Sequence, residues 1–203
     1  MSSVIATKVI TKKMALALTT LLLIGPVTQT NAQSNVGIKQ ISFNEQRGMH
    51  KIGSGTLSWL GFDVYTATYY TDLSGNEIEK EFPGWQLGKR ATLELTYHRK
   101  ISTAQLISAT QKIWKKMGIK LASEEDHIQR LYKIWPGVNK NDTLTLRINE
   151  NGVSDFYINN RYLGSIESSE FSLAFISIWT AQETPNQELR NNLLGFNKYL
   201  NNT

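Results

Sequence analysis

The chain has 203 residues but no cysteine, only four prolines and only three histidines. Without cysteine it can form no disulfide bond, thiolate nucleophile or cysteine-ligated zinc site. His50, His98 and His127 lie far apart in sequence, and none has a second ligand at helical or turn spacing. We therefore expect no metal site and no cofactor. Few prolines and no low-complexity run also argue against a long linker.

Common catalytic motifs are also missing. Gly53-Ser-Gly55 suggests the start of a dinucleotide-binding loop, but Ser58 occupies the third glycine position and no helix is expected to follow. The Gly-x-Ser-x-Gly pattern of α/β-hydrolases does not occur. Glu124, Glu125 and Asp126 are expected in the first turn of a helix, where acidic residues favour the helix dipole. Their placement therefore has a structural explanation.

The N-terminal segment has the composition of a secretory signal peptide. It carries Lys8, Lys12 and Lys13 without any acidic residue, then an apolar run over residues 14–27, then small and polar residues ending at Ala32. The run contains Pro26 and is shorter than the ~20 residues that a membrane-spanning helix requires. We expect residues 1–32 to be a signal peptide and residues 33–203 to form one exported domain. The pattern is bacterial in style and predicts a periplasmic protein without a membrane span after cleavage. We also expect a monomer.

The signal segment also explains most of the net charge of +5. Removing its three lysines from the 22 basic residues leaves 19 basic against 17 acidic residues, a net charge of +2. Four further lysines (Lys112, Lys115, Lys116 and Lys120) gather on one predicted helix, where such a group is usually a solvated face. Trp114 lies on the apolar side of that helix. Nucleic-acid binding is therefore not expected.

Strands are predicted by alternation and by β-branched and aromatic residues. Residues 50–60 and 61–71 form two candidate strands, separated by Gly61. In residues 91–97, Leu93, Leu95 and Tyr97 share one face, and Thr92, Glu94 and Thr96 share a solvated one. Residues 143–149, 153–158 and 161–166 follow as a three-stranded meander, with Asn151-Gly152 as a hairpin turn.

Helices are predicted by apolar spacing of three and four residues. One begins after Ser102 or Thr103 and ends at Gly118. The second begins with Ser123-Glu-Glu-Asp126, which is similar to a capping box, and ends before Pro136. A third starts near Glu170, and a short last helix follows Pro185. Because the strands come in antiparallel runs rather than singly between helices, we predict an α+β fold with helices packed on a large antiparallel sheet.

The aromatic residues of the first two strands allow two interpretations. Trp59, Phe62, Tyr65, Tyr69 and Tyr70 are denser than average for the chain. They could form an ordinary sheet core, with tyrosine hydroxyls reaching its edge. They could also line a ligand cleft between the sheet and the helices. Composition favours the core.

Three segments together resemble the chalcone isomerase-like family, in its bacterial exported branch. They are Gly53-Ser-Gly-Thr-Leu-Ser-Trp-Leu-Gly-Phe-Asp-Val-Tyr-Thr-Ala-Thr-Tyr-Tyr70, Leu93-Glu-Leu-Thr-Tyr-His-Arg-Lys-Ile-Ser102, and Phe156-Tyr-Ile-Asn-Asn-Arg-Tyr-Leu-Gly-Ser-Ile166 with the helical residues after it. The resemblance spans about residues 50 to 195. It implies an open-faced sandwich with a cleft between a large antiparallel sheet and its helices. The implied cleft residues are Trp59, Tyr65, Leu106, Thr110 and Ile113.

The resemblance also implies where the chain departs from the enzymes of the family. Plant chalcone isomerases use a cleft arginine, a threonine, and a tyrosine and an asparagine on a helix. Gly55 falls at the arginine, Tyr65 at the threonine, Leu106 at the tyrosine and Ile113 at the asparagine. The fatty-acid-binding relatives also use that arginine, to hold a carboxylate. No arginine occurs between Arg47 and Arg90.

These substitutions make a non-catalytic protein the leading hypothesis. It would bind a small apolar ligand (a lipid, haem or a flavonoid-like molecule) or a protein partner in the cell envelope. The alternative is an intramolecular lyase of the chalcone isomerase type, in which Tyr65, Tyr69 or Thr110 serve as replacement donors. A third hypothesis is a stability or assembly factor for an envelope enzyme.

Overall fold

The computed structural model describes residues 48–74, 77–78 and 85–197. The predicted signal peptide lies outside the described residues. The strands are β1 (His50–Trp59), β2 (Phe62–Thr71), β3 (Ala91–Tyr97), β4 (Thr143–Ile148), β5 (Val153–Ile158) and β6 (Arg161–Glu167). The helices are α2 (Thr103–Met117), α3 (Glu124–Ile134), α4 (Ser169–Thr180) and α5 (Gln187–Leu193).

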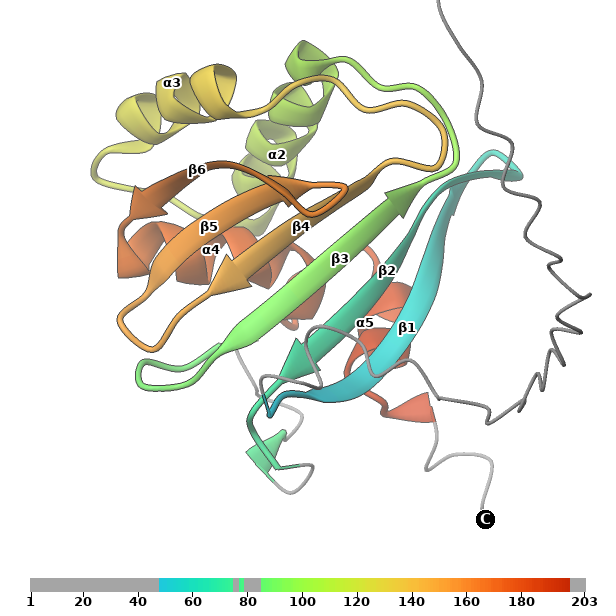
Figure 1. Ribbon diagram of the computed structural model, residues 1–203. Coiled ribbons are helices and arrows are strands. Elements are labelled where there is room, and N and C mark those ends of the chain that lie inside the picture. Colours follow the sequence, from blue (N-terminus) through green and yellow to red (C-terminus); the bar gives the residue numbers. More distant parts are fainter. Residues whose placement is uncertain (1–47, 75–76, 79–84, 198–203) are drawn as a thin grey trace, which may run out of the picture. The chain divides into compact units, whose positions relative to one another are not determined.

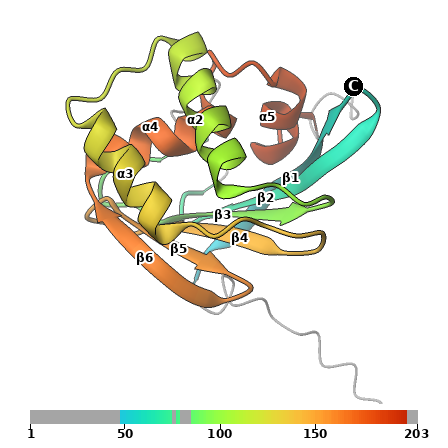
Figure 2. The same cartoon turned by 90° about the horizontal axis from the view of Figure 1, so that it is seen from above.

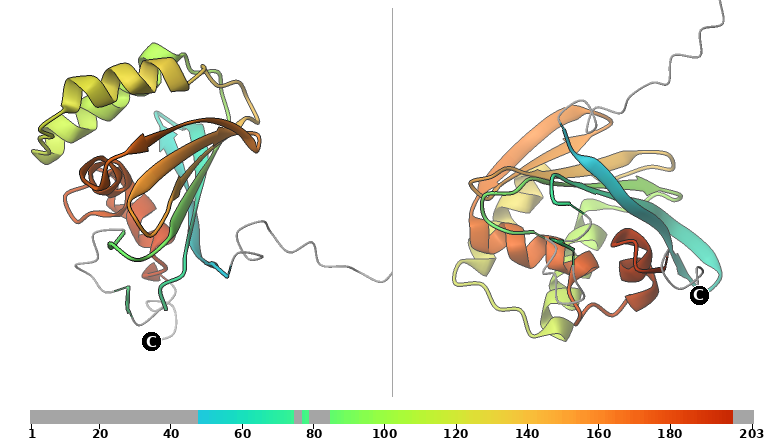
Figure 3. Two further views of the ribbon diagram at one scale, coloured as in Figure 1. Left: turned by 60° about the vertical axis from the view of Figure 1, so that its left-hand side comes forward. Right: turned by 90° about the horizontal axis from the view of Figure 1, so that it is seen from below.

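The six strands form one antiparallel sheet in the order β1-β2-β3-β4-β5-β6, so each strand pairs with its neighbour in the chain. All four described helices lie on one face of this sheet (Figures 1 and 2). The sheet is twisted and curls toward the helices (Figure 3). The predicted α+β open-faced sandwich is confirmed.

The inner face of the sheet is set by the alternation of side chains. Leu93 of β3 pairs with Tyr69 of β2 and with Leu146 of β4, and all three are buried. The predicted alternation of β3 fails at Thr92, which is buried although it belongs to the outer face. Its hydroxyl lies 3.8 Å from the sulfur of Met49, a buried residue just before β1, so chain beyond the sheet covers this position.

Local capping fixes where α2 begins and ends. Ser102 is the N-cap and forms a capping box with Gln105: the Ser102 hydroxyl accepts from the Gln105 amide at 3.3 Å, and the Ser102 amide donates to the Gln105 side chain at 2.9 Å. Gly118 ends the helix at φ +70°. The buried Trp114 donates from its indole nitrogen to the Ala174 carbonyl at 2.9 Å, which joins α2 to α4. The four lysines of the α2 region are exposed, as predicted.

The predicted capping box of the second helix is wrong. Helix α3 does begin at Glu124, but the Ser123 side chain makes no capping hydrogen bond. The Ser123 backbone (φ −117°, ψ 40°) is outside the extended region from which an N-cap side chain reaches the first-turn amides. The three acidic residues of the first turn remain as the favourable feature of this helix end.

Aromatic rings from α4, α2 and β5 pack against one another between the helices and the sheet. Phe171 and Phe175, one turn apart on α4, stack at 5.4 Å. Phe156 of β5 meets both of them edge-on, and Trp114 meets both from α2. Phe171 is fully buried. We call Trp114, Phe156, Phe171 and Phe175 the packed half of the interior.

Candidate functional site

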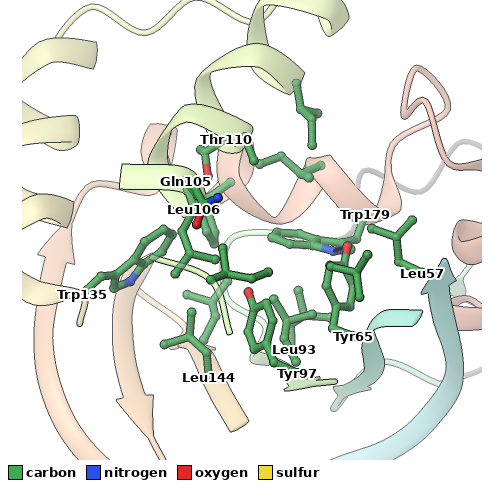
Figure 4. Close-up of a pocket in the computed structure, with 18 of the residues that line it drawn as sticks. Leu57, Tyr65, Leu93, Tyr97, Gln105, Leu106, Thr110, Trp135, Leu144 and Trp179 are labelled. Atoms are coloured by element: carbon green, nitrogen blue, oxygen red, sulfur yellow. Dashed lines mark hydrogen bonds between the residues drawn. The ribbon is translucent and has the colours of Figure 1, made fainter. Parts of the chain in front are cut away.

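An apolar pocket lies between α2 and the inner face of the sheet, beside the packed half (Figure 4). Its cavity measures about 170 Å³. The lining side chains come from β1–β5, α2, α4 and the segments beside them: Leu57, Val64, Tyr65, Leu93, Leu95, Tyr97, Ile101, Gln105, Leu106, Ala109, Thr110, Ile113, Trp135, Leu144, Leu146, Phe156, Phe175, Ile178 and Trp179. Among the lining residues there is no charged side chain, no histidine and no methionine.

Two tyrosines supply the polar end of the pocket. Tyr65 and Tyr97 pair directly across β2 and β3, and their rings meet edge-on at 5.6 Å. The Tyr65 oxygen accepts a hydrogen bond of 2.9 Å from the indole nitrogen of Trp179. That bond uses the Tyr65 oxygen and leaves the hydroxyl proton available. Within the described residues the proton has no acceptor. The Tyr97 hydroxyl likewise has no hydrogen-bond partner there, and both rings point toward the cavity (Figure 4).

Burial keeps both phenols neutral. Desolvation raises the pKa of Tyr65 from 10.0 to about 12, although the hydrogen bond from Trp179 opposes part of that shift. Desolvation also holds the pKa of Tyr97 well above its ordinary value, with a smaller contribution from the nearby Tyr65. At neutral pH these groups are therefore hydrogen-bond donors and are unsuited to act as bases.

The helix side of the pocket adds two further polar groups. Thr110 donates its hydroxyl proton to the Leu106 carbonyl at 3.1 Å, so its oxygen can only accept from a ligand. Gln105 lines the pocket while its side-chain oxygen completes the capping box of α2. Both side chains are thus held in place by the helix that carries them.

Positive charge lies in a surface hollow that adjoins the pocket, which we call the pocket mouth. This hollow shares Leu57, Val64, Ile101 and Gln105 with the pocket and is also lined by Arg99 and Lys100. Both cations are exposed and form no ion pair within the described part of the chain. The pocket is therefore neutral inside and basic at its entrance.

Four of the five predicted cleft residues (Tyr65, Leu106, Thr110 and Ile113) line the pocket. The structure places the fifth, Trp59, outside it. This side chain is 65% exposed at the end of β1, where the hairpin runs beyond the helices that close the pocket. Tyr69 is also absent from the lining, and it is fully buried further along β2, opposite Leu93. Whether the lining residues bind a ligand stays a prediction.

Sequence reasoning missed Tyr97, Trp135 and Trp179 as pocket residues. Tyr97 was identified on the inner face of β3, but alternation cannot tell an inner position beneath a helix from one beside a cavity. Trp179 follows the helical spacing of α4, and its hydrogen bond to Tyr65 joins residues 114 positions apart. Trp135 comes directly after α3. The usable signal was an aromatic residue at the end of an element.

At the position where the family resemblance implies an arginine, helix α5 packs against β1 instead. A Cβ atom added at Gly55 would lie 2.9 Å from both the Asn192 Cβ and the Leu189 Cδ1 of α5. At Gly53, an added Cβ would collide with the backbone carbonyls of Asn192 and Leu193. The two glycines therefore let α5 pack directly on β1, where an arginine side chain has no room.

The histidines do not come together. His98 makes a 2.8 Å hydrogen bond to Thr66, and the ring of His127 packs 5.2 Å from that of Phe171. Over residues 48–74, 77–78 and 85–197, no group of three or more histidine, aspartate or glutamate side chains is placed to hold a metal ion. The same residues contain no helix with the length and apolarity needed to cross a bilayer.

The sequence profile of the chalcone isomerase-like family matches residues 35–195, which include the whole sheet and all four described helices. The chain belongs to the chalcone isomerase-like family. The fold also resembles the crystal structure of a fatty-acid binding protein from Arabidopsis thaliana, with a TM-score of 0.59 over 77% of this chain and 91% of the other. At 16% identity this likeness concerns the fold. No curated protein sequence matches the chain significantly.

The polar groups of the pocket lining can take part in hydrogen bonds. A base of suitable pKa within reach of the substrate is needed for general base catalysis. The polar groups of the lining are two neutral phenols, two indoles, one amide and a threonine whose proton is already donated. Tyr65 and Thr110 can therefore supply or accept hydrogen bonds, but they do not form an acid–base pair, and Tyr69 lies outside the lining.

Proposed function

We propose that this protein is exported and binds one slender apolar molecule, such as the acyl chain of a single-chain lipid. The observation that carries the proposal is the 170 Å³ apolar cavity with hydroxyl groups at one end. Each methylene moved from water into such a cavity contributes about 0.8 kcal/mol to binding. A comparable engineered cavity of ~150 Å³ stays dry and takes up benzene.

The polar groups of the pocket favour a ligand with an acceptor oxygen. Tyr65 and Tyr97 both present hydroxyl protons, and neither proton has an acceptor within the described residues. A carbonyl, ester, hydroxyl or protonated carboxyl oxygen could accept from both. The fatty-acid binding protein of similar fold supports an acyl ligand for this chain as well.

Two of the ligand classes expected from sequence fit less well. Haem needs an iron ligand, and no histidine, methionine or other customary haem ligand except tyrosine lines the pocket. A flavonoid would bury several hydroxyl groups against leucine and isoleucine, where polar groups without hydrogen bonds are unfavourable. A single acyl chain needs partners at one end only.

Export rests on the N-terminal sequence. The basic segment, the apolar run over residues 14–27 and the small residues before Ala32 support cleavage at that point. N-terminal sequencing of the protein recovered from the periplasm tests the proposal. A first residue of Gln33 is the expected result, and an intact Met1 would contradict it.

A blocked pocket tests ligand binding directly. Ala109 lines the pocket from α2 and is exposed, so Ala109→Trp would place an indole in the opening without removing a core contact. With cis-parinaric acid as a fluorescent probe, we expect the variant to bind at least about tenfold more weakly, a loss of roughly 1.4 kcal/mol.

Ala104→Trp is the matched control, because Ala104 is exposed on the same helix and does not line the pocket. It should bind the probe as the unaltered protein does. Failure of the unaltered protein to bind cis-parinaric acid, decanol or decanoic acid would refute the proposal.

A further inference from the structure

The hairpin between β1 and β2 carries the largest concentration of exposed apolar side chains among the described residues. Trp59, Leu60 and Phe62 are 65%, 75% and 70% exposed, and they are consecutive except for Gly61. We call these three side chains the apolar tip. Scattered exposed apolar residues are ordinary, but a contiguous group marks an interaction surface.

The backbone of the turn makes Leu60 an unusual choice of residue. Leu60 has φ +51° and Gly61 has φ +79°, so both central residues of this two-residue turn are left-handed. Asn-Gly and Asp-Gly are the favoured pairs for such a turn, and a leucine there is strained. A leucine that is strained and yet 75% exposed has no evident role in stability.

Cations flank the apolar tip. A surface hollow is lined by Trp59, Leu60 and Phe62 together with Asp63, His98 and Arg99. Lys100 follows at the pocket mouth, and Asp63 already accepts a 2.6 Å hydrogen bond from the Ser58 hydroxyl. Arg99 and Lys100 thus face solvent beside the tip against a single carboxylate.

The tip is also continuous with the pocket. The hollow at the pocket mouth is lined by Trp59 and Arg99 together with Leu57 and Gln105, which also belong to the pocket lining. A molecule that leaves an external surface on which the tip is docked would therefore reach the pocket mouth next.

From these observations we propose that the β1–β2 tip inserts into a bilayer containing anionic phospholipids, with the pocket mouth against the headgroups. Tryptophan prefers the bilayer interface, leucine and phenylalanine the acyl boundary, and arginine and lysine anionic headgroups. Three side chains bury less area than the ~800 Å² per partner of a stable protein interface, which favours a bilayer over a protein partner. The inference rests on the proposed function, to which it adds the source of the ligand.

Vesicle binding by the full chain tests this docking. Co-sedimentation with phosphatidylcholine vesicles, with and without phosphatidylglycerol, should show stronger binding to the anionic ones. Brominated phosphatidylcholine should quench tryptophan fluorescence, and the quenching reports Trp59 because the other four tryptophans are all buried. Arg99→Gln and Lys100→Gln should each weaken binding to anionic vesicles about fivefold.

Leu60→Gly is the decisive variant, because it removes an apolar side chain and relieves the left-handed strain, so the fold is retained. It should lower vesicle binding and leave cis-parinaric acid binding in vesicle-free solution unchanged. Leu87→Ser, at a residue that is 72% exposed but outside the tip, is the control and should change neither. The N-terminal segment is common to every variant, so differences between variants report the tip.

Equal vesicle binding by Leu60→Gly and the unaltered protein, or no quenching of Trp59, would overturn the docking proposal. A protein that takes up the probe but ignores vesicles refutes docking alone. One that binds vesicles but takes up no probe refutes the proposed ligand binding alone.

Discussion

The interior of this protein contains two regions with different packing. In the packed half, rings from α4, β5 and α2 meet edge-on or stacked at 5.4–6.4 Å, and two of these rings, Phe156 and Phe175, form the wall shared with the pocket. In the pocket half, lined by Tyr65, Leu95, Tyr97 and Leu144 beneath α2, a cavity of about 170 Å³ remains. The helix residues that face this cavity include the small Ala109 and Thr110. The same sheet thus provides stability on one side and room for a ligand on the other.

Truncation of the packed half should have the largest effect. Phe171→Ala removes a fully buried ring that contacts Trp114, Phe156 and Phe175. We expect the free energy of unfolding to fall by about 3–5 kcal/mol, because both the burial and the surrounding contacts are lost. Urea denaturation measures this change. A loss below about 1 kcal/mol would mean that the packed half is looser than its geometry indicates.

Enlarging a leucine should change the free energy of unfolding differently beside the cavity and at a buried site away from it. Leu144→Phe adds volume beside the cavity, so we expect unchanged or slightly raised stability together with weaker cis-parinaric acid binding. Leu131→Phe adds the same volume at a fully buried site outside the pocket and should cost about 1–3 kcal/mol. Equal destabilisation of both variants in urea would show that the pocket half has no room.

Removal of the Tyr65 hydroxyl should have the smallest effect on stability. Tyr65→Phe leaves the Trp179 indole without its acceptor, which costs about 1 kcal/mol at neutral pH, and it weakens probe binding. The alkaline limb of the stability profile should also change. Because the folded protein holds the pKa of Tyr65 at about 12, the unfolded chain releases this proton first, near pH 10. Stability is therefore lost between about pH 10 and pH 12.

Urea titrations from pH 8 to pH 12 measure this dependence. Tyr65→Phe should flatten part of the alkaline loss, and the remainder belongs to the other buried tyrosines, Tyr69 and Tyr97. Tyr162→Phe, at an exposed position on β6, serves as the control. An alkaline profile that Tyr65→Phe leaves unaltered would show that this phenol is not buried in solution.

Much of the fold could be predicted because its signals are local. Alternation placed Leu93, Leu95 and Tyr97 on the inner face, and the Ser102 cap and Gly118 set both ends of α2. The second capping box failed although its sequence pattern was suggestive, because a cap also depends on the backbone angles of Ser123. Those angles depend on how the chain arrives from α2.

The site was harder to predict for a related reason. Whether a tyrosine is core or cleft depends on what lies above the sheet, and β2 presents Tyr65 and Tyr69 to the same face. Tyr65 lies beside the cavity and Tyr69 beneath close packing. The export segment, the monomeric state and a protein partner stay predictions.

The sequence by itself determined the order of strands and helices and the absence of thiol chemistry, because these follow from residue types and their spacing. Its segments also resemble the family that the profile match shows. Only the tertiary structure decided which residues surround the pocket. Gly53 and Gly55 admit α5 where an arginine side chain would not fit, Trp179 from α4 meets Tyr65, and Trp59 is left at the surface. Each of these contacts joins segments that are distant in the chain, and such distances are fixed only when helices and sheet have packed together.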